Sequence, residues 1–240
     1  VDVGRGLAKA MQSADGFALV TTRVQDTQLS VSLTDAAREH LQKDAIERSL
    51  EVLRRRLDES GLVEPSITRQ GSEYILVQMP GVEDPSEIRA LLGTTAKMTF
   101  HWAANTQHSA TNITLPDANS DRLYVLESHV ALEGQHVSDA QFAFNQDNQQ
   151  PVVNFKLDNE GARKFGDMTR KNIGRVLAIV LDDKVLTAPV IRGVIAGGSG
   201  EISGDFDARQ ASELALLLRA GALPIPLDVL EERTVGPDLG

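Results

Sequence analysis

The sequence predicts an α+β fold in which a ferredoxin-like base with repeated βαβ units carries an inserted α+β head. A chain of 240 residues, 41% hydrophobic and 24% charged, can bury the core of one large domain or two smaller ones. A strand, a Gly-x-x-Asp turn, a helix, a glycine and another strand occur twice, around Gly81 and Gly204. The stretch between the copies is flanked by a polar linker and a Gly-rich return. We therefore expect a base over 1–103 plus 200–240 and a head over 104–199.

Two hairpins are predicted early in the base. Residues 17–24 and 28–33 are short β-rich runs, and the second alternates strictly between apolar and polar side chains. Residues 66–70 and 74–79 form a similar pair, because the three residues between them are enough to close a hairpin.

A long helix is predicted between these hairpins, capped by Thr34 or Asp35 and ending near Ser60 before Gly61. One face carries the apolar side chains, at spacings of four, three and four: Ile46, Leu50, Leu53 and Leu57.

The run Arg54-Arg55-Arg56 in this helix could be a functional cluster. Glu51 precedes Arg55 by four residues, however, and Arg54 precedes Asp58 by four, which is the spacing of surface ion pairs. We expect the three arginines to lie on a solvated face.

The repeated unit supplies the rest of the base. Its first copy is predicted to contain a helix from Pro85 to Leu92 and a strand over 95–103. Its second copy is predicted to contain a helix that ends at Leu218 and a strand over 227–231.

The head is expected to contain its own strands and one helix. Residues 133–150, rich in Gln, Asn and Asp, are predicted to be a mobile loop. The predicted strands are 122–127, 151–157, 176–181 and 185–191, the last two joined by a turn at Asp182-Asp183-Lys184, and the predicted helix runs from Asp158 or Asn159 to Lys171.

Composition excludes several classes of function. A formal net charge of −10 argues against nucleic acid as a partner, because that affinity depends largely on neutralising phosphates. The absence of cysteine excludes disulfides, thiolate metal sites and cysteine nucleophiles. No run of 18 apolar residues is present to span a bilayer.

No motif predicts a metal, a cofactor or a catalytic centre. The pairs His101/His108 and His129/His136 are each seven residues apart, which matches no known ligand spacing, and solvated histidines are expected. Asp182 and Asp183 are expected to form a turn. The Gly197–Gly200 segment resembles a phosphate-binding loop but leads into a strand, so we interpret it as a flexible linker.

Several motifs together resemble SecD, a family of membrane subunits that assist the bacterial Sec protein-export channel. The resemblance runs from about residue 38 to the end and is weakest over 104–150. It is carried by LRRRLDESGLVEP at 53–65, RQG at 69–71, VQMPGVED at 77–84, NIGR at 172–175, LLLRAGALP at 216–224 and EERTVGPDLG at 231–240.

This resemblance implies the first large periplasmic domain of a multi-pass inner-membrane protein, with Gly236 and Pro237 at the membrane junction. The domain itself would be the soluble, substrate-handling part, and the membrane carboxylates that use the proton gradient in the family are absent from this chain. The implied partners are unfolded preproteins, the Sec channel and SecF.

Two functional features of the head are expected. Ala103 and Ala104 on one side and Gly197 and Gly198 on the other are paired small-residue connections that could form a hinge. Binding of many unrelated unfolded segments should use apolar surface and strand edges, for which Phe142 and Phe144 are the candidates. A core strand is an equally good interpretation of these two residues, because large apolar side chains are usually buried.

Two alternatives remain open at this stage. A ferredoxin-like periplasmic domain of another transporter, such as an efflux-pump porter domain, would share the βαβ pattern but not the motifs at 216–224 and 231–240. A periplasmic hydrolase would need convergent polar groups, and the sequence contains none at diagnostic spacing.

Overall fold

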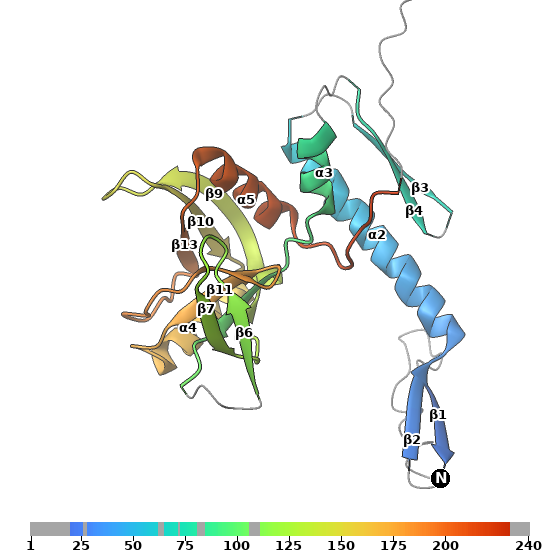
Figure 1. Cartoon of the computed structure of the whole chain (residues 1–240), viewed down its shortest axis with the longest axis horizontal. Coiled ribbons are helices and arrows are strands. Elements are labelled where there is room, and N and C mark those ends of the chain that lie inside the picture. Colours follow the sequence, from blue (N-terminus) through green and yellow to red (C-terminus); the bar gives the residue numbers. More distant parts are fainter. Residues whose placement is uncertain are drawn as a thin grey trace, which may run out of the picture. The chain divides into compact units, whose positions relative to one another are not determined.

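The computed structural model describes residues 20–25, 28–61, 65–71, 73–80, 85–105 and 111–230. The chain divides into two compact units, one of residues 1–51 and 66–78 and the other of residues 52–65 and 79–240 (Figure 1). The elements form an α+β fold of several antiparallel sheets and the helices α2 to α5. No helix in these described ranges is long and apolar enough to cross a bilayer.

The first unit contains two hairpins and the first part of a long helix. Strand β1 (Val20–Gln25) pairs with β2 (Gln28–Leu33), and β3 (Ser66–Gln70) pairs with β4 (Tyr74–Gln78), as the sequence predicts. Helix α2 (Asp35–Glu59) is capped by Thr34, whose hydroxyl accepts the Ala37 N–H at 3.0 Å. The four apolar residues of the predicted stripe are all buried: Ile46, Leu50, Leu53 and Leu57.

The second unit is built on two antiparallel sheets. In the four-stranded sheet the order is β12-β11-β5-β8, and in the three-stranded sheet it is β13-β10-β9. The strands are β5 (Met98–Trp102), β8 (Leu132–Glu133), β9 (Val137–Phe144), β10 (Pro151–Leu157), β11 (Leu177–Leu181), β12 (Lys184–Thr187) and β13 (Ser199–Ser203).

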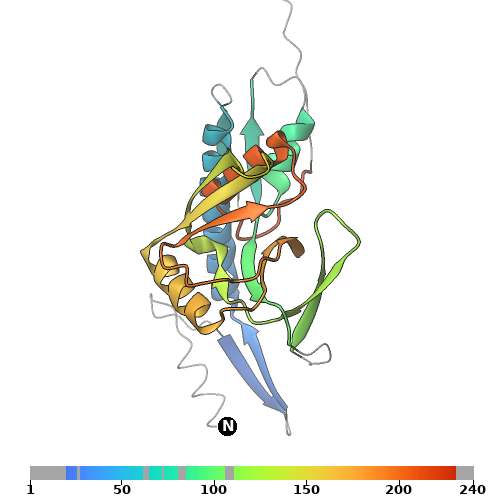
Figure 2. The same ribbon diagram turned by 90° about the vertical axis from the view of Figure 1, so that its left-hand side faces the viewer.

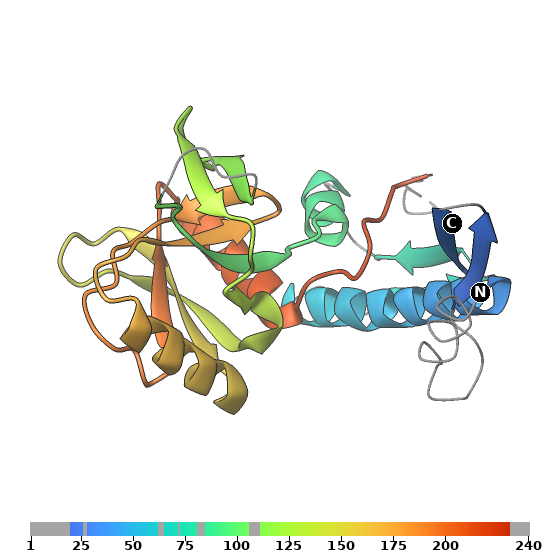
Figure 3. The ribbon, with the colours of Figure 1, turned by 90° about the horizontal axis from the view of Figure 1, so that it is seen from below.

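Helices and one further hairpin complete this unit. Helix α5 (Ala208–Ala220) packs along β9 and β10 (Figure 3). The hairpin β6 (Asn112–Pro116) and β7 (Leu123–Glu127), green in Figure 2, packs through Leu126 against β11 and β12. The other elements are α3 (Pro85–Gly93), the short 3-10 helix η1 (Gly134–His136) and α4 (Asn159–Lys171).

Aromatic side chains join the two sheets in one core. The Phe100 ring of β5 lies 5.8 Å from that of Phe155 on β10 and 5.9 Å from that of Phe165 on α4. Ile202 of β13 and Leu214 of α5 belong to the same buried cluster. The hydrophobic core of the second unit therefore includes residues from before, within and after the predicted head.

The domain boundaries at residues 103/104 and 199/200 stay a prediction, and this shared core argues against them. β5 lies inside its sheet between β11 and β8, and β13 pairs with β10. A strand cannot be separated from the partners that satisfy its backbone without exposing them. In the described residues β3 and β4 pair only with each other, so no four-stranded ferredoxin-like sheet forms around them.

Several local expectations differ from the structure. Residues 137–144, predicted as part of a mobile loop, are strand β9, whose N–H and C=O groups pair with β10. No strand forms over 227–230, the described part of the predicted last strand, and Pro224 and Pro226 just before it lack N–H donors. Ser199 and Gly200, interpreted as a flexible linker, belong to β13.

Arg56 is fully buried, so the expectation of a solvated arginine face is wrong at this position. Its guanidinium donates to the carbonyl oxygens of Leu91 at 2.7 Å, Thr94 at 2.6 Å and Gly221 at 3.3 Å. Leu91 and Thr94 lie at the C-terminal end of α3, where a helix leaves carbonyl acceptors unpaired, and Gly221 follows α5. Burial lowers the pKa of Arg56 to about 10, and the nearby Asp182 carboxylate partly offsets this effect.

Candidate functional site

Phe142 and Phe144 lie on β9, an end strand of the three-stranded sheet. Their rings are 5.0 Å apart at an interplanar angle of 72°, an edge-to-face pair. Phe142 is partly buried against the core cluster, whereas Phe144 is 54% exposed. The strand interpretation holds for both residues, and their role in binding unfolded chains stays a prediction.

The register of β9 shows which backbone groups face outward from the sheet. Phe144 is opposite Pro151, and Asn145 donates its N–H to the Gln150 carbonyl at 2.9 Å. In an antiparallel pair, hydrogen-bonded and non-bonded positions alternate, so Phe144 and Phe142 occupy non-bonded positions. Their N–H and C=O groups point away from β10, and none of the described residues makes a backbone hydrogen bond to them from that side.

The outward carbonyl next along this edge does have a partner. Arg219, in the last turn of α5, donates from Nη1 to the Ala140 carbonyl at 2.5 Å. The same guanidinium donates from Nε to the Glu59 carboxylate of α2 at 2.6 Å. Arg219 therefore joins the end of α2 to the edge of β9.

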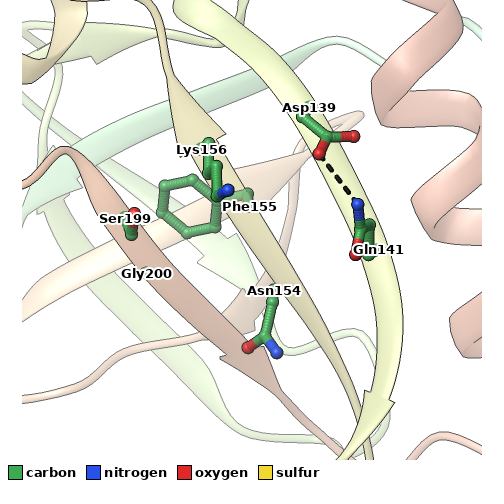
Figure 4. Close-up of a pocket in the computed structure, with 7 residues that line it drawn as sticks. All are labelled: Asp139, Gln141, Asn154, Phe155, Lys156, Ser199 and Gly200. Atoms are coloured by element: carbon green, nitrogen blue, oxygen red, sulfur yellow. Dashed lines mark hydrogen bonds between the residues drawn. The ribbon is translucent and has the colours of Figure 1, made fainter.

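The same three-stranded sheet carries a shallow pocket of about 260 Å³ on its polar face (Figure 4). The amide of Gln141 donates to the Asp139 carboxylate at 3.0 Å, and Lys156 lies opposite Asp139 in the strand register. The lining residues are Asp139, Gln141, Asn154, Phe155, Lys156, Ser199 and Gly200. These groups include no nucleophile held by a general base, the arrangement that covalent catalysis requires.

A mainly apolar cavity of about 420 Å³ also lies in the second unit. Its walls include the buried rings of Phe100, Phe155 and Phe165, together with the segment 189–195. The Ile191 N–H donates to the Arg175 carbonyl at 2.9 Å, so this segment is tied to the chain that precedes β11.

Three of the four hinge candidates, Ala103, Ala104 and Gly198, are held by hydrogen bonds or by packing. The Ala103 N–H donates to the Val176 carbonyl at 2.9 Å and the Ala104 N–H donates to the Val125 carbonyl at 3.0 Å. Gly198 has φ +62°, and a Cβ there would meet Ala162 at 2.4 Å, whereas a Cβ on Gly197 would meet nothing within 4 Å. A hinge at these residues stays a prediction, and this geometry argues against it.

The NIGR motif at 172–175 fixes one of these connections. Arg175 donates to the Asn172 side chain at 2.9 Å and to the Ala103 carbonyl at 3.2 Å, and it also pairs with Glu127. Its guanidinium lies 5.0 Å from the Trp102 ring centre, within cation–π range. The motif therefore holds the end of β5 against β7.

Two histidines are buried rather than solvated, which corrects the sequence expectation. His101 contacts the Glu127 carbonyl at 2.9 Å and the Thr99 hydroxyl at 3.1 Å. His136 lies 3.2 Å from the Asp158 carboxylate and is also buried. His129 is exposed, and His108 lies outside the described residues.

The remaining polar candidates, Asp182 and Asp183, form a turn. Asp182 and Asp183 both have positive φ in the β11–β12 turn, as the turn interpretation predicts, and the Asp182 carboxylate accepts the N–H groups of Ala96 and Lys97 at 2.9 Å. No group of three His, Asp or Glu side chains that could hold a metal occurs in the part of the chain that is described. The membrane-junction candidates Gly236 and Pro237 lie outside that part.

Sequence reasoning missed the roles of Arg56, Arg175 and Arg219. The only local signal for Arg219 is a basic residue in the last turn of a helix, which more often interacts with that helix's own carbonyls. Apart from the local contact between Arg175 and Asn172, the partners of these arginines come from distant segments. No spacing in the sequence could identify those distant partners.

Comparisons with known proteins point to one protein family for residues of both units. A family model described as "SecDF, P1 head subdomain" matches residues 111–225, which include β13 and α5, and one described as "Protein translocase subunit SecDF, P1 domain, N-terminal" matches residues 46–105. The chain is 42% identical to the protein translocase subunit SecD of Rhodobacter capsulatus over 249 residues, covering 100% of this chain and 45% of that protein. It is 47% identical to SecD of Acetobacter pasteurianus over 206 residues, covering 82% of this chain and 39% of that protein.

Solved structures give the same result. A structure described as that of "a membrane component SecDF that enhances protein export" superposes with a TM-score of 0.68 at 31% identity, covering 90% of this chain and 98% of that chain. A SecDF crystal structure in a super-membrane-facing form superposes with a TM-score of 0.67 at 36% identity, covering 78% of this chain and 28% of that chain. The chain thus spans less than half the length of these curated relatives.

Proposed function

Since the chain belongs to the SecD family of protein-translocase subunits, of which it forms the P1 domain, we propose that its second unit captures unfolded segments of exported chains on the edge of β9. As part of a translocase subunit, the protein is a component of transport machinery and not an enzyme. Family membership also excludes the alternative that the chain is an efflux-pump porter domain.

The observation that carries this proposal is the outward-facing backbone of Phe142 and Phe144. An extended peptide can add to such an edge as another strand, and its main-chain hydrogen bonds do not depend on its sequence. The exposed Phe144 ring would supply apolar contact beside these bonds. This combination suits a partner that must accept many unrelated sequences.

The expected binding is weak and insensitive to salt. Ordering a disordered peptide offsets much of the contact energy, so the dissociation constant should be on the order of micromolar or poorer. The edge residues Ala140, Phe142 and Phe144 are uncharged, so added salt has little charge attraction to screen there.

The setting of this activity is part of the same proposal. We place the domain on the periplasmic side of the bacterial inner membrane, beside SecF and the Sec channel, in proton-motive-force-dependent export. The relatives described as SecDF support association with SecF.

Site-specific photo-crosslinking in membrane vesicles tests the capture site. A photoreactive residue at position 144 of the full-length subunit should crosslink to a translocating chain. One at Ile173, which is 55% exposed at the end of α4 and lies on no strand edge, serves as the apolar control. Equal crosslinking from both positions, or none from 144, would contradict the proposed site.

A pair of substitutions at Phe144 separates backbone from side-chain recognition. Phe144→Ala removes the ring, whereas Phe144→Pro removes both the ring and the outward N–H, and the ladder to β10 loses no donor because this position is non-bonded. We expect a labelled unfolded apolar peptide to bind Phe144→Pro about three- to tenfold more weakly than Phe144→Ala. Equal affinities with intact folding would exclude strand addition at this residue.

A further inference from the structure

Arg219 occupies the edge at which the proposed peptide would bind. The outward groups of β9 belong to alternate residues, so a strand added beside Phe142 and Phe144 would next use Ala140. The Ala140 carbonyl already accepts a hydrogen bond from Arg219 Nη1 at 2.5 Å. A peptide that extends along the edge must therefore displace the guanidinium from this acceptor.

Glu59 holds Arg219 in this place. The Glu59 carboxylate accepts from Arg219 Nε at 2.6 Å, and both side chains are about one-third exposed. The planar guanidinium can donate to both partners at once in a fixed orientation, which an ammonium group cannot reproduce. Removing the carboxylate would leave the long Arg219 side chain with a single neutral acceptor and more conformational freedom.

We propose that Glu59, Arg219 and the Ala140 carbonyl form an autoinhibitory clamp that shortens the binding edge of β9. This inference rests on the proposed function, because it concerns access to the same edge. The clamp joins the C-terminal end of α2, which belongs to the second unit, to α5 and β9. Because Glu59 is the last residue of α2, a shift of this helix relative to α5 would release Arg219 and lengthen the available edge.

Binding of a labelled, unfolded apolar peptide to the complete chain, followed by fluorescence anisotropy, tests the clamp. Glu59→Gln keeps the size of the side chain and removes its charge, and Arg219→Met keeps most of the apolar stem. We expect each to bind the peptide about three- to tenfold more tightly than the unchanged protein. Because both act through one contact, the double variant should bind no more tightly than the better single variant.

Asp167→Asn is the matched control, because Asp167 forms an equally close pair with Arg170 at 2.7 Å on α4, away from this edge. Its affinity for the peptide should equal that of the unchanged protein. Arg219→Lys provides a second variant that retains the charge, and it should also bind more tightly because it loses the two-sided contact.

The outcomes separate the clamp from the capture site. Peptide binding that is equal or weaker in folded Glu59→Gln and Arg219→Met than in the unchanged protein would overturn the clamp and leave the proposed function standing. Absence of binding by all the proteins, including the unchanged one, would overturn both.

Discussion

Strands β5 and β9 belong to the same unit but differ in almost every property. All five residues of β5 are buried, including Thr99 and His101, and neighbouring strands flank it on both sides. β9 ends its sheet, its side chains range from buried to exposed, and Phe144 faces solvent. The comparison shows that one strand is buried between two others, while the other leaves one side of its backbone without a partner strand and an aromatic ring exposed.

The largest expected effect is a difference in stability between an alanine substitution on β5 and one on β9. Phe100→Ala on β5 removes a fully buried ring that contacts two others, and it should lower the free energy of unfolding by about 3–5 kcal/mol. Phe144→Ala on β9 should lower it by less than about 1 kcal/mol, because the ring is already half-exposed. Denaturant titrations of both variants measure these losses, and similar losses would contradict the assignment of β9 as a binding edge.

The segment that leads into β13, the other end strand of the sheet that contains β9, is expected to be rigid. Gly198→Ala, just before β13, combines a left-handed backbone with a Cβ 2.4 Å from Ala162, and should destabilise the fold by about 2–4 kcal/mol. Gly197→Ala meets open space and should cost less than about 1 kcal/mol. A tolerated Gly198→Ala would instead favour the hinge interpretation of this connection.

The helix that packs on β9 should depend moderately on its cap. The Asp207 carboxylate accepts the Gln210 N–H at 2.7 Å, and the Gln210 side chain accepts the Asp207 N–H at 2.9 Å. Asp207→Ala should therefore lower the free energy of unfolding, measured by denaturant titration, by about 1 kcal/mol. Asp205→Ala removes an exposed carboxylate two residues earlier and should leave stability nearly unchanged, so an equal loss in both would show that the cap is not responsible.

The smallest effect is expected from acid at the start of α4. The Gly161 N–H and then His136 hold the pKa of the Asp158 carboxyl below its ordinary value of 3.8. A carboxyl whose pKa is lowered by folding stabilises the folded state above its unfolded pKa and loses this contribution as pH falls through the folded value. Between pH 6 and pH 3, melting temperatures should fall further for the unchanged protein than for Asp158→Asn. Asp167→Asn is the control, and a fall as small as that of Asp158→Asn would point to a general charge effect.

The contrast between β5 and β9 also explains what the sequence could predict. Helix α4 and strands β10 and β11 have clear apolar patterns or an Asp cap, so their positions were predicted to within one residue or so. The composition around β9 predicts a loop, because residues such as Asp139 and Gln141 are polar and composition does not distinguish a partly exposed strand from a loop.

Tertiary pairing accounts for most of the remaining differences. The pairing of β5 with β11 and of β13 with β10 depends on which strands meet in space, and side-chain patterns do not encode it. Arg56 lies in the same run of sequence as Arg54 and Arg55, so its sequence neighbours do not mark it as different. Only the fold brings carbonyl acceptors to its side chain, from Leu91, Thr94 and Gly221. Phe142 and Phe144 can be proposed from the sequence, whereas the contacts of Arg219 with Glu59 and Ala140 depend on distant segments.

The position of β5 inside its sheet has a consequence for the order of folding. Trp102 pairs with Leu177, about 75 residues later in the chain. Closing so large a loop costs conformational entropy before any contact is gained, so folding of this unit should be slow for its size. During synthesis β5 must wait until β11 has appeared, and its apolar face is exposed to other chains during that interval.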